Sequence, residues 1–269
     1  MDDVLLRSPS SSAARRLWAT WIRRDLPHWW LPAVIAVTAA YTMLTLLVMA
    51  GSGLTELDTY VYDLHLVPID SRLRLPVQLW VFFGQRAPAM IIAALFAAWC
   101  AVHARSVRPL VMYGLAGFGF VASVLTLKYV TGRVGPRYTD IAHTVWDGGN
   151  IFPSGHVTGT VVMYGLIALL APQAYRRALT IVAVVLSVTV GMGTAALNLH
   201  WATDVIGGWF NGVLVLLAVW AITPHVQHLL TTNWRRLTHW YRSATRSHSD
   251  LPFDTTALRE LDWPAAGRR

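Results

Sequence analysis

Residues 178–197 read ALTIVAVVLSVTVGMGTAAL, a run of twenty residues without a charged side chain. A helix of about 20 apolar residues is long enough to cross the hydrocarbon core of a bilayer. Five more apolar runs of this kind occupy residues 156–171, 203–223, 109–130, 80–103 and 29–51. The sequence therefore predicts an all-α, polytopic membrane protein whose six transmembrane helices form a bundle.

The overall composition agrees with a membrane protein. Of the 269 residues, 55% are apolar and 13% are charged, whereas roughly 25% of the residues in an ordinary soluble domain are charged. This balance excludes a disordered chain and a protein that wraps nucleic acid. The single cysteine, Cys100, excludes an internal disulfide, and its place in an apolar run predicts a small buried hydrophobic side chain.

Basic residues are distributed unevenly between the loops. With six membrane crossings, 16 of the 22 Lys and Arg residues lie on the side of both termini and six lie on the other side. Basic residues in short loops favour the cytoplasmic side, so we expect both termini in the cytoplasm and the segment 52–77 outside. Attraction to anionic lipid headgroups then accounts for the net charge of +8, and no nucleic-acid partner is expected.

Three regions are predicted along the chain. A cytoplasmic N-terminal arm (1–28) precedes the membrane domain (29–223), and a cytoplasmic basic tail (224–269) follows it. The arm is too long for a secretory signal peptide and lacks a small-residue cleavage pattern, so the run 29–51 is expected to remain as a transmembrane helix. Residues 231–269 are polar and rich in arginine, so we expect them to lie on the membrane surface or to be disordered.

The first candidate site segment is KYVTGRVGPR, residues 128–137, on the predicted extracytoplasmic side. Lys128 is the one lysine of the chain and ends an apolar run. It is interpreted either as an interfacial anchor or as a phosphate ligand. Arg133 and Arg137 stand in a turn with glycine and proline, which suits guanidinium groups that donate to phosphate oxygens. The alternative for both arginines is contact with lipid headgroups.

The second segment is Pro153-Ser154-Gly155-His156, which is typical of a helix start. Ser154 can cap the helix, and Gly155 allows backbone N–H groups to approach an anion closely. His156 would then stand on the first turn and face the anion, or serve only as a polar cap. This segment predicts an anion site.

The third segment, NLHWATD at 198–204, holds His200 and Asp204 four residues apart. On a helix the two side chains share a face, so the carboxylate can accept a hydrogen bond from one imidazole nitrogen and leave the other free to attack. A purely structural pair is the alternative. Two histidines and one aspartate are too few ligands for a metal site, so we expect no metal and no cofactor.

Together the three segments resemble the type 2 phosphatidic acid phosphatase family, whose signature is K-x6-R-P, then PSGH, then S-R-x5-H-x3-D. Lys128 and Pro136 match the first element, residues 153–156 match the second, and His200 and Asp204 match the end of the third. The resemblance covers about residues 29–223. It implies a six-helix membrane fold related in its core to vanadium haloperoxidases and bacterial acid phosphatases.

Two positions depart from this signature. Gly135 stands where the first element has arginine, and Gly193-Thr194 replaces the Ser-Arg pair of the third. Arg133 and Arg137 lie on either side of Gly135, and we expect one of them to substitute for the missing guanidinium. For Thr194 the sequence offers no replacement except Asn198, which could donate a neutral hydrogen bond.

The resemblance implies a mechanism. His200 attacks a phosphoryl group in line and forms a phosphohistidine, Asp204 orients the ring, and His156 protonates the leaving group and then activates water. The phosphate oxygens are held by a set of cationic and backbone donors. This set consists of Lys128, Arg133, Arg137, Ser154 and Gly155.

The implied substrate is a lipid phosphate or diphosphate, with membrane lipids as the remaining partners. Phosphatidic acid, phosphatidylglycerol phosphate and a polyprenyl diphosphate such as undecaprenyl diphosphate are all candidates. Two alternatives stay open: a transferase that passes a phosphoryl or headgroup to an alcohol, and a catalytically weak lipid-binding protein. The sequence makes no prediction about the oligomeric state.

Overall fold

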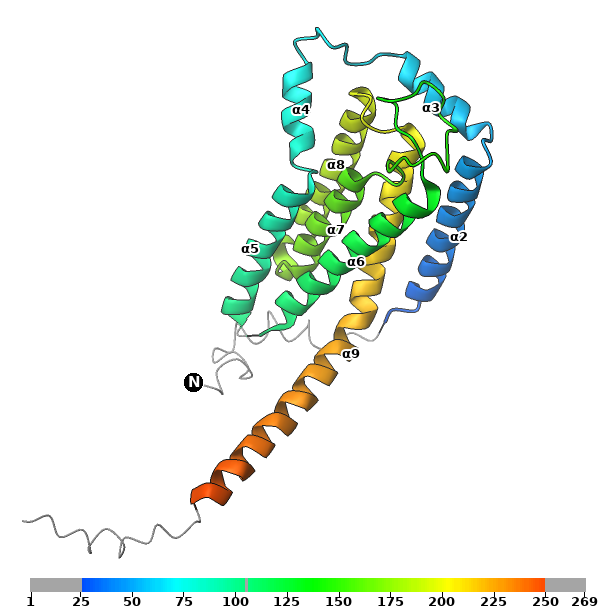
Figure 1. Cartoon of the computed structure of the whole chain (residues 1–269). Helices are drawn as coiled ribbons and strands as arrows, with labels where there is room; N and C mark the ends of the chain where they lie inside the picture. Colours follow the sequence, from blue (N-terminus) through cyan, green and yellow to red (C-terminus); the bar gives the residue numbers. More distant parts are fainter. Residues whose placement is uncertain (1–25, 105, 250–269) are drawn as a thin grey trace, which may run out of the picture. The chain divides into compact units, whose positions relative to one another are not determined.

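The computed structural model describes residues 26–104 and 106–249, and the side chains of this part up to residue 230. Within these residues the regular elements are helices (Figure 1). They are α2 (Trp30–Met49), α3 (Leu54–Asp63), α4 (Arg74–Phe82), α5 (Arg86–Ala104), α6 (Arg108–Thr131), α7 (Gly155–Leu170), α8 (Gln173–Ala196) and α9 (Ala202–Ser249). The predicted all-α class is confirmed for this part of the chain.

Five of the described helices are long and apolar enough to cross a membrane. These are α2, α5, α6, α8 and the part of α9 from Ala202 to Leu230. The multi-pass architecture is therefore confirmed, whereas the count of six is not. The predicted run 156–171 forms α7, which has 16 residues and is shorter than the ~20 that span a hydrocarbon core.

Helix α7 is the central helix of the bundle. It contacts α5, α6 and α8 (Figure 1), and 11 of its 16 residues are buried. Its neighbours form one hydrophobic core with it, in which Ala89, Ala93 and Ala97 line a single face of α5. Cys100 continues this face and is fully buried, as its place in an apolar run predicts.

The second predicted run, 80–103, is interrupted at its start. Helix α4 ends at Phe82, and α5 begins at Arg86. Gly84 lies in the turn between them, residues 83–85, and a Cβ there would come within 2.5 Å of Val190 Cγ1 and 3.3 Å of the His156 carbonyl oxygen. Because glycine has no side chain, the α4–α5 turn can pack directly on the first turn of α7.

The segment 52–77, expected as a loop with a short helix, contains α3 and the start of α4. Helix α3 contacts α2 and α8. Its inward face buries Thr55 and Asp58. A carboxylate buried in this segment needs a partner, which the site below supplies.

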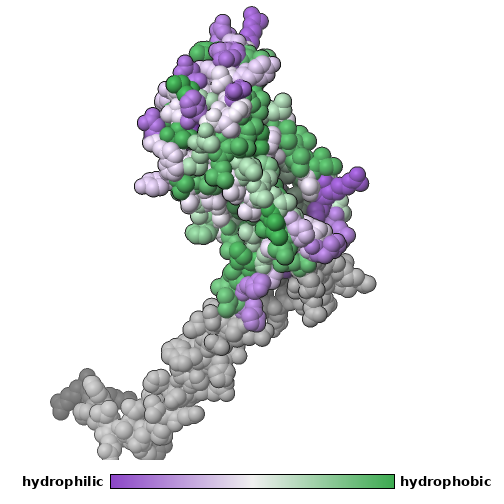
Figure 2. Space-filling view, turned by 90° about the vertical axis from the view of Figure 1, so that its right-hand side faces the viewer, coloured by the Kyte–Doolittle hydropathy of each residue, from purple (hydrophilic) through white to green (hydrophobic). Residues whose placement is uncertain are grey.

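The surface of the described bundle is largely apolar. In Figure 2, hydrophobic side chains cover most of the middle of this face, and hydrophilic ones gather at the upper end and at the lower right. Leu95, Val102 and Phe118 are among the large apolar side chains left exposed. Such a surface is expected of helices that face lipid.

The chain divides into two compact units at Pro224, and the second begins at His225. Helix α9 extends to Ser249, so the expectation of disorder is wrong for residues 231–249, which are helical. Their expected place on the membrane surface stays a prediction. Residues 1–25 and 250–269, the bulk of the predicted arm and the end of the predicted tail, lie outside the described residues.

Candidate active site

One pocket brings the predicted segments together. It has a volume of about 580 Å³ and lies where α6 ends and where α5 and α7 begin. Five of the eight predicted site residues line it: Lys128, Arg137, Gly155, His156 and His200. The other three, Arg133, Ser154 and Asp204, do not line this pocket and are fully buried.

The two histidines face each other in this pocket. Their ring centroids are 5.7 Å apart and their planes are inclined by 74°. His156 stands on the first turn of α7, whereas His200 lies in the turn before α9, which begins at Ala202. The expectation that His200 and Asp204 share a helix face is therefore wrong in detail. His200 Nδ1 is nevertheless 3.5 Å from Asp204 Oδ2, close enough for an ion pair.

Asp204 accepts hydrogen bonds from the residues that precede two helices. Its Oδ2 accepts a hydrogen bond of 2.9 Å from the backbone N–H of Trp201, the residue before α9. Its backbone carbonyl accepts one of 2.9 Å from the N–H of Ser154, the residue before α7. The residues just before α9 and α7 therefore hold Asp204 in place beside His200, so its position is set by the backbone.

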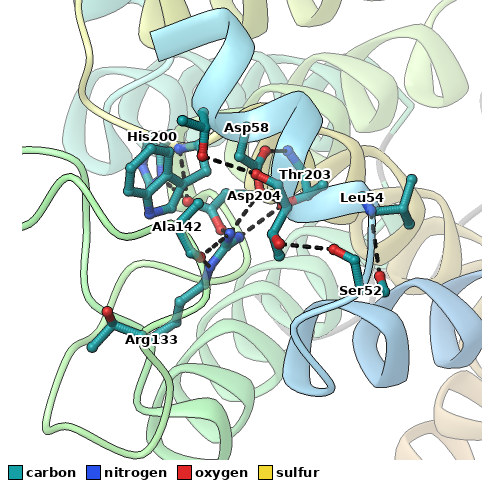
Figure 3. A network of polar contacts seen from close by, with 12 residues as sticks. Ser52, Leu54, Asp58, Arg133, Ala142, His200, Thr203 and Asp204 are labelled. Atoms are coloured by element: carbon teal, nitrogen blue, oxygen red, sulfur yellow. Dashed lines mark hydrogen bonds and ion pairs between the residues drawn. The ribbon is translucent and has the colours of Figure 1, made fainter. Parts of the chain in front are cut away.

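Arg133 provides the counter-charge of this carboxylate (Figure 3). Its Nη1 donates to Asp204 Oδ1 at 2.6 Å and to Thr203 Oγ1 at 2.8 Å. Its Nη2 donates to Asp58 Oδ2 at 2.6 Å and to the Ala142 carbonyl at 2.6 Å, and Nε donates to the same carbonyl at 3.1 Å. With its donors occupied inside the protein, Arg133 is not placed to bind phosphate, which corrects the sequence prediction.

Asp58 completes this network, and sequence reasoning missed it. Its Oδ1 accepts a hydrogen bond of 2.7 Å from the backbone N–H of Thr203, in the first turn of α9, and its Oδ2 accepts one of 2.6 Å from the Thr203 hydroxyl. A carboxylate is favourable at a helix N-terminus. Burial raises the pKa of Asp58, while the charge of Arg133 and the bonds from Thr203 oppose this shift. No motif marks Asp58, because its partners come from remote segments.

Ser154 caps α7 as the sequence predicts, but it does not reach the pocket. Its hydroxyl accepts a hydrogen bond of 3.4 Å from the Val157 N–H. Its own backbone N–H donates to the backbone carbonyl oxygen of Asp204. The assignment of Ser154 to phosphate binding is therefore corrected to capping. Gly155 does line the pocket, at a helix N-terminus that favours anions.

Three cations line the pocket: Lys128, Arg137 and Arg86. Lys128 donates from Nζ to the carbonyl oxygen of Asn150. The sequence analysis did not predict Arg86 as a site residue. A single charge that interrupts an apolar run could have indicated it. Among the described residues that line the pocket there is no carboxylate, so the pocket is suited to an anion.

Neighbouring side chains pack closely around the positions that depart from the motif. A Cβ on Gly135 would lie 3.1 Å from Ile151 Cγ1, and a Cβ on Gly193 would lie 2.8 Å from Val81 Cγ2 of α4. Thr194 is fully buried, and its hydroxyl donates to the Gly191 carbonyl in its own helix at 2.7 Å.

Asn198, the neutral substitute considered above, has a φ of 50° in the turn after α8. It does not line the pocket, so its amide is not placed to replace the absent arginine. Within the described ranges, no group of three or more His, Cys, Asp or Glu side chains is arranged to hold a metal ion.

Comparison with known proteins agrees with the motif resemblance. Residues 105–227 match the model of the PAP2 superfamily, which confirms the resemblance to the type 2 phosphatidic acid phosphatase family. Phosphatidylglycerophosphatase B of Bacillus subtilis (strain 168) is 30% identical over 99 residues, which are 35% of this chain and 47% of that protein. The chain thus spans about half the length of this curated relative.

A solved structure shares the fold. The crystal structure of a transmembrane PAP2-type phosphatidylglycerolphosphate phosphatase from Bacillus subtilis superposes with a TM-score of 0.61 at 20% sequence identity. The match covers 70% of this chain and 94% of the other. The overall fold is therefore one that a solved transmembrane protein adopts.

Proposed function

We propose that this chain, whose residues 105–227 match the PAP2 superfamily, is an integral membrane phosphatase that hydrolyses a lipid phosphate or diphosphate. The observation that carries this proposal is the pocket itself. It combines two facing histidines with three cations and, among its described lining residues, no carboxylate. This arrangement can bind a phosphate group and supply both a nucleophile and a proton donor.

In the proposed first step, His200 is the nucleophile. Its Nδ1 faces Asp204 at 3.5 Å, so a proton on Nδ1 leaves Nε2 with a free electron pair. Nε2 forms a bond to phosphorus while the bond between phosphorus and the lipid oxygen breaks. The ring becomes a phosphorylated imidazolium, whose positive charge is stabilised by the Asp204 carboxylate.

His156 transfers a proton in both steps. In its protonated form it donates a proton to the departing lipid oxygen. It then accepts a proton from the water that attacks phosphorus, and the N–P bond breaks to release inorganic phosphate and neutral His200. The ring separation of 5.7 Å is short enough for both imidazoles to act on one phosphate group.

Phosphate binding is assigned to Lys128, Arg137 and the first-turn amides of α7 at Gly155. These groups line the same pocket as the histidines, and they can donate to the oxygens that carry charge in the transition state. Arg133 acts behind them as a positioning residue, because it holds Asp204 rather than the substrate.

The proposed substrate is phosphatidylglycerol phosphate, after the activity named for the Bacillus relative; phosphatidic acid and polyprenyl diphosphates are the comparison substrates. The pocket is proposed to open on the extracytoplasmic face. The support is the 16-to-6 distribution of basic residues between the two sides of the membrane. It assigns the termini to the side with 16 basic residues, and the helix ends that carry the site to the side with six.

A phosphoryl- or headgroup-transferase is the second candidate. The observation that favours it is the buried Thr194, which leaves the pocket without one guanidinium of the hydrolase signature. In such an enzyme an alcohol, not water, would accept the group from His200.

Phosphate release by the purified full-length protein tests both candidates. Wild type, His200→Ala and the control His103→Ala, an exposed residue at the last turn of α5, are given the three lipid phosphates. A phosphatase releases phosphate in water, retains this activity in His103→Ala and loses it in His200→Ala. Turnover only with an added alcohol indicates a transferase, and no turnover with or without alcohol contradicts both.

A further inference from the structure

Among the three cations that line the pocket, Arg86 is the one for which neither the motifs nor the proposed mechanism has a role. It is the first residue of α5, it is exposed, and it lines the pocket together with Lys128, His156 and His200. Its guanidinium forms no ion pair with any described residue. Arg133, by contrast, has its guanidinium fully occupied by protein partners.

The backbone that carries Arg86 is held against the catalytic helix. The carbonyl oxygen of Phe83 accepts a hydrogen bond of 3.1 Å from the Tyr164 hydroxyl of α7. Trp80 donates from Nε1 to Thr189 Oγ1 of α8 at 2.9 Å. With Gly84 packed on the His156 carbonyl, the α4–α5 turn is fixed on both sides, and so is the point from which the Arg86 side chain departs.

The protein's own charges make the position of Arg86 electrostatically unfavourable. A positive charge at the N-terminus of a helix opposes the helix dipole. Lys128 adds a like charge in the same pocket, and no described carboxylate lines it to compensate. An anion bound between these cations would reverse the balance, because a guanidinium can donate two parallel hydrogen bonds to phosphate oxygens.

We infer that Arg86 binds the phosphoryl group, so that the α4–α5 turn supplies the guanidinium that is absent at Gly135 and Thr194. The role for Arg86 rests on the proposed function only in that the ligand is a phosphate. It adds a binding residue from a part of the chain outside the three motif segments and outside residues 105–227, which match the superfamily.

Binding of orthovanadate, a phosphate analogue that can adopt five-coordinate geometry, tests this role without requiring turnover. The full-length protein in detergent is titrated as wild type, Arg86→Ala, Arg86→Lys and the control Arg74→Ala, which alters an α4 arginine outside the pocket. Arg86→Ala should weaken vanadate binding at least about tenfold, the effect of losing a charge-assisted hydrogen bond. Arg86→Lys should fall between, because lysine keeps the charge and loses the planar fork.

Equal affinity of wild type and Arg86→Ala overturns the inference, and so does an absence of vanadate binding by wild type. Equal loss in Arg74→Ala also overturns it, because the effect would then be one of general charge. Thermal melting of each variant shows that it is folded. If vanadate binding depends on Arg86 while no lipid phosphate is hydrolysed, the inference stands and the proposed phosphatase function fails.

Discussion

At the scale of single residues, two arginines four positions apart have opposite environments. Arg133 is fully buried between Asp58 and Asp204, whereas Arg137 is exposed and lines the pocket. A buried guanidinium that neutralises two carboxylates supports the fold, and one at a pocket wall can bind a ligand. The two positions therefore allow a matched comparison.

Arg133→Ala and Arg137→Ala should both lower activity, but only Arg133→Ala should also lower the melting temperature substantially. Removing Arg133 leaves two buried carboxylates without their cation, and breaking a buried pair costs roughly 3–5 kcal/mol, so the melting temperature and the activity should both fall. Removing Arg137 should lower phosphate release by about 10²-fold with little change in melting. Melting and turnover are measured on the same preparations. A normally melting Arg133→Ala protein would show that Arg133 does not support the fold.

Arg133→Met should also make stability depend on pH through Asp58. Burial raises the pKa of this carboxyl, and the variant removes the charge that opposes the shift. A carboxyl whose pKa is higher in the folded state binds more protons when folded, so stability is greatest in acid and falls as the pH rises through that pKa. The destabilisation should therefore be larger at neutral than at acidic pH.

Chemical unfolding of Arg133→Met across this pH range measures the effect. The control is the double variant Arg133→Met with Asp58→Asn, which has no carboxyl to titrate at this position. A pH dependence that persists unchanged in the double variant would assign it to another group.

At the scale of elements, the close packing at Gly84 helps to position the α4–α5 turn. Gly84→Ala would place a Cβ within 2.5 Å of Val190 Cγ1 and 3.3 Å of the His156 carbonyl. The turn must then move away from α7 and from Val190 of α8, at a cost of about 1–3 kcal/mol for overpacking. A displacement of ~1 Å near a reaction centre can cost about 10²-fold in rate. The turnover of the folded variant should therefore fall, in addition to its loss of stability.

The matched control is Gly114→Ala in α6, because a Cβ there meets nothing within 4 Å. Alanine also favours helix over glycine by about 1 kcal/mol, so this variant should be as stable as wild type and fully active. Turnover and unfolding free energy are measured for both. Full activity of Gly84→Ala would show that the turn can move without disturbing the site.

At the scale of the whole molecule, α7 determines the predicted membrane topology. Its 16 residues extend about 24 Å at 1.5 Å per residue, whereas the hydrocarbon core is about 30 Å thick. Six crossings put the two termini on the same side, and five put them on opposite sides. The polar pocket at its N-terminal end and its burial among α5, α6 and α8 compensate for the short length.

Reporter fusions at the two termini should both be active in the cytoplasm, as the 16-to-6 distribution of basic residues predicts. A reporter inserted at residues 66–70, in the connection between α3 and α4, should be active outside. Termini on opposite sides would mean that α7 does not complete a crossing, and a reversed pattern would place the pocket in the cytoplasm.

The all-α class, the approximate positions of the apolar helices and the two histidines of the pocket could all be predicted from the amino-acid sequence. These features are local, because a bilayer selects each helix by its own apolar run, and a helix N-cap is set by a few neighbouring residues. Lys128, Gly155 and His156 stand at such helix ends, so their common location followed from the order of the runs.

Which cations face the pocket and which support it depends on the three-dimensional fold. Arg133 is paired with Asp58, 75 positions away, and with Asp204, 71 positions away. Arg86 reaches the pocket because Gly84 allows the α4–α5 turn to contact α7. The balance between burial of a charge and its pairing depends on partners from remote segments, and no local pattern of residues encodes that balance.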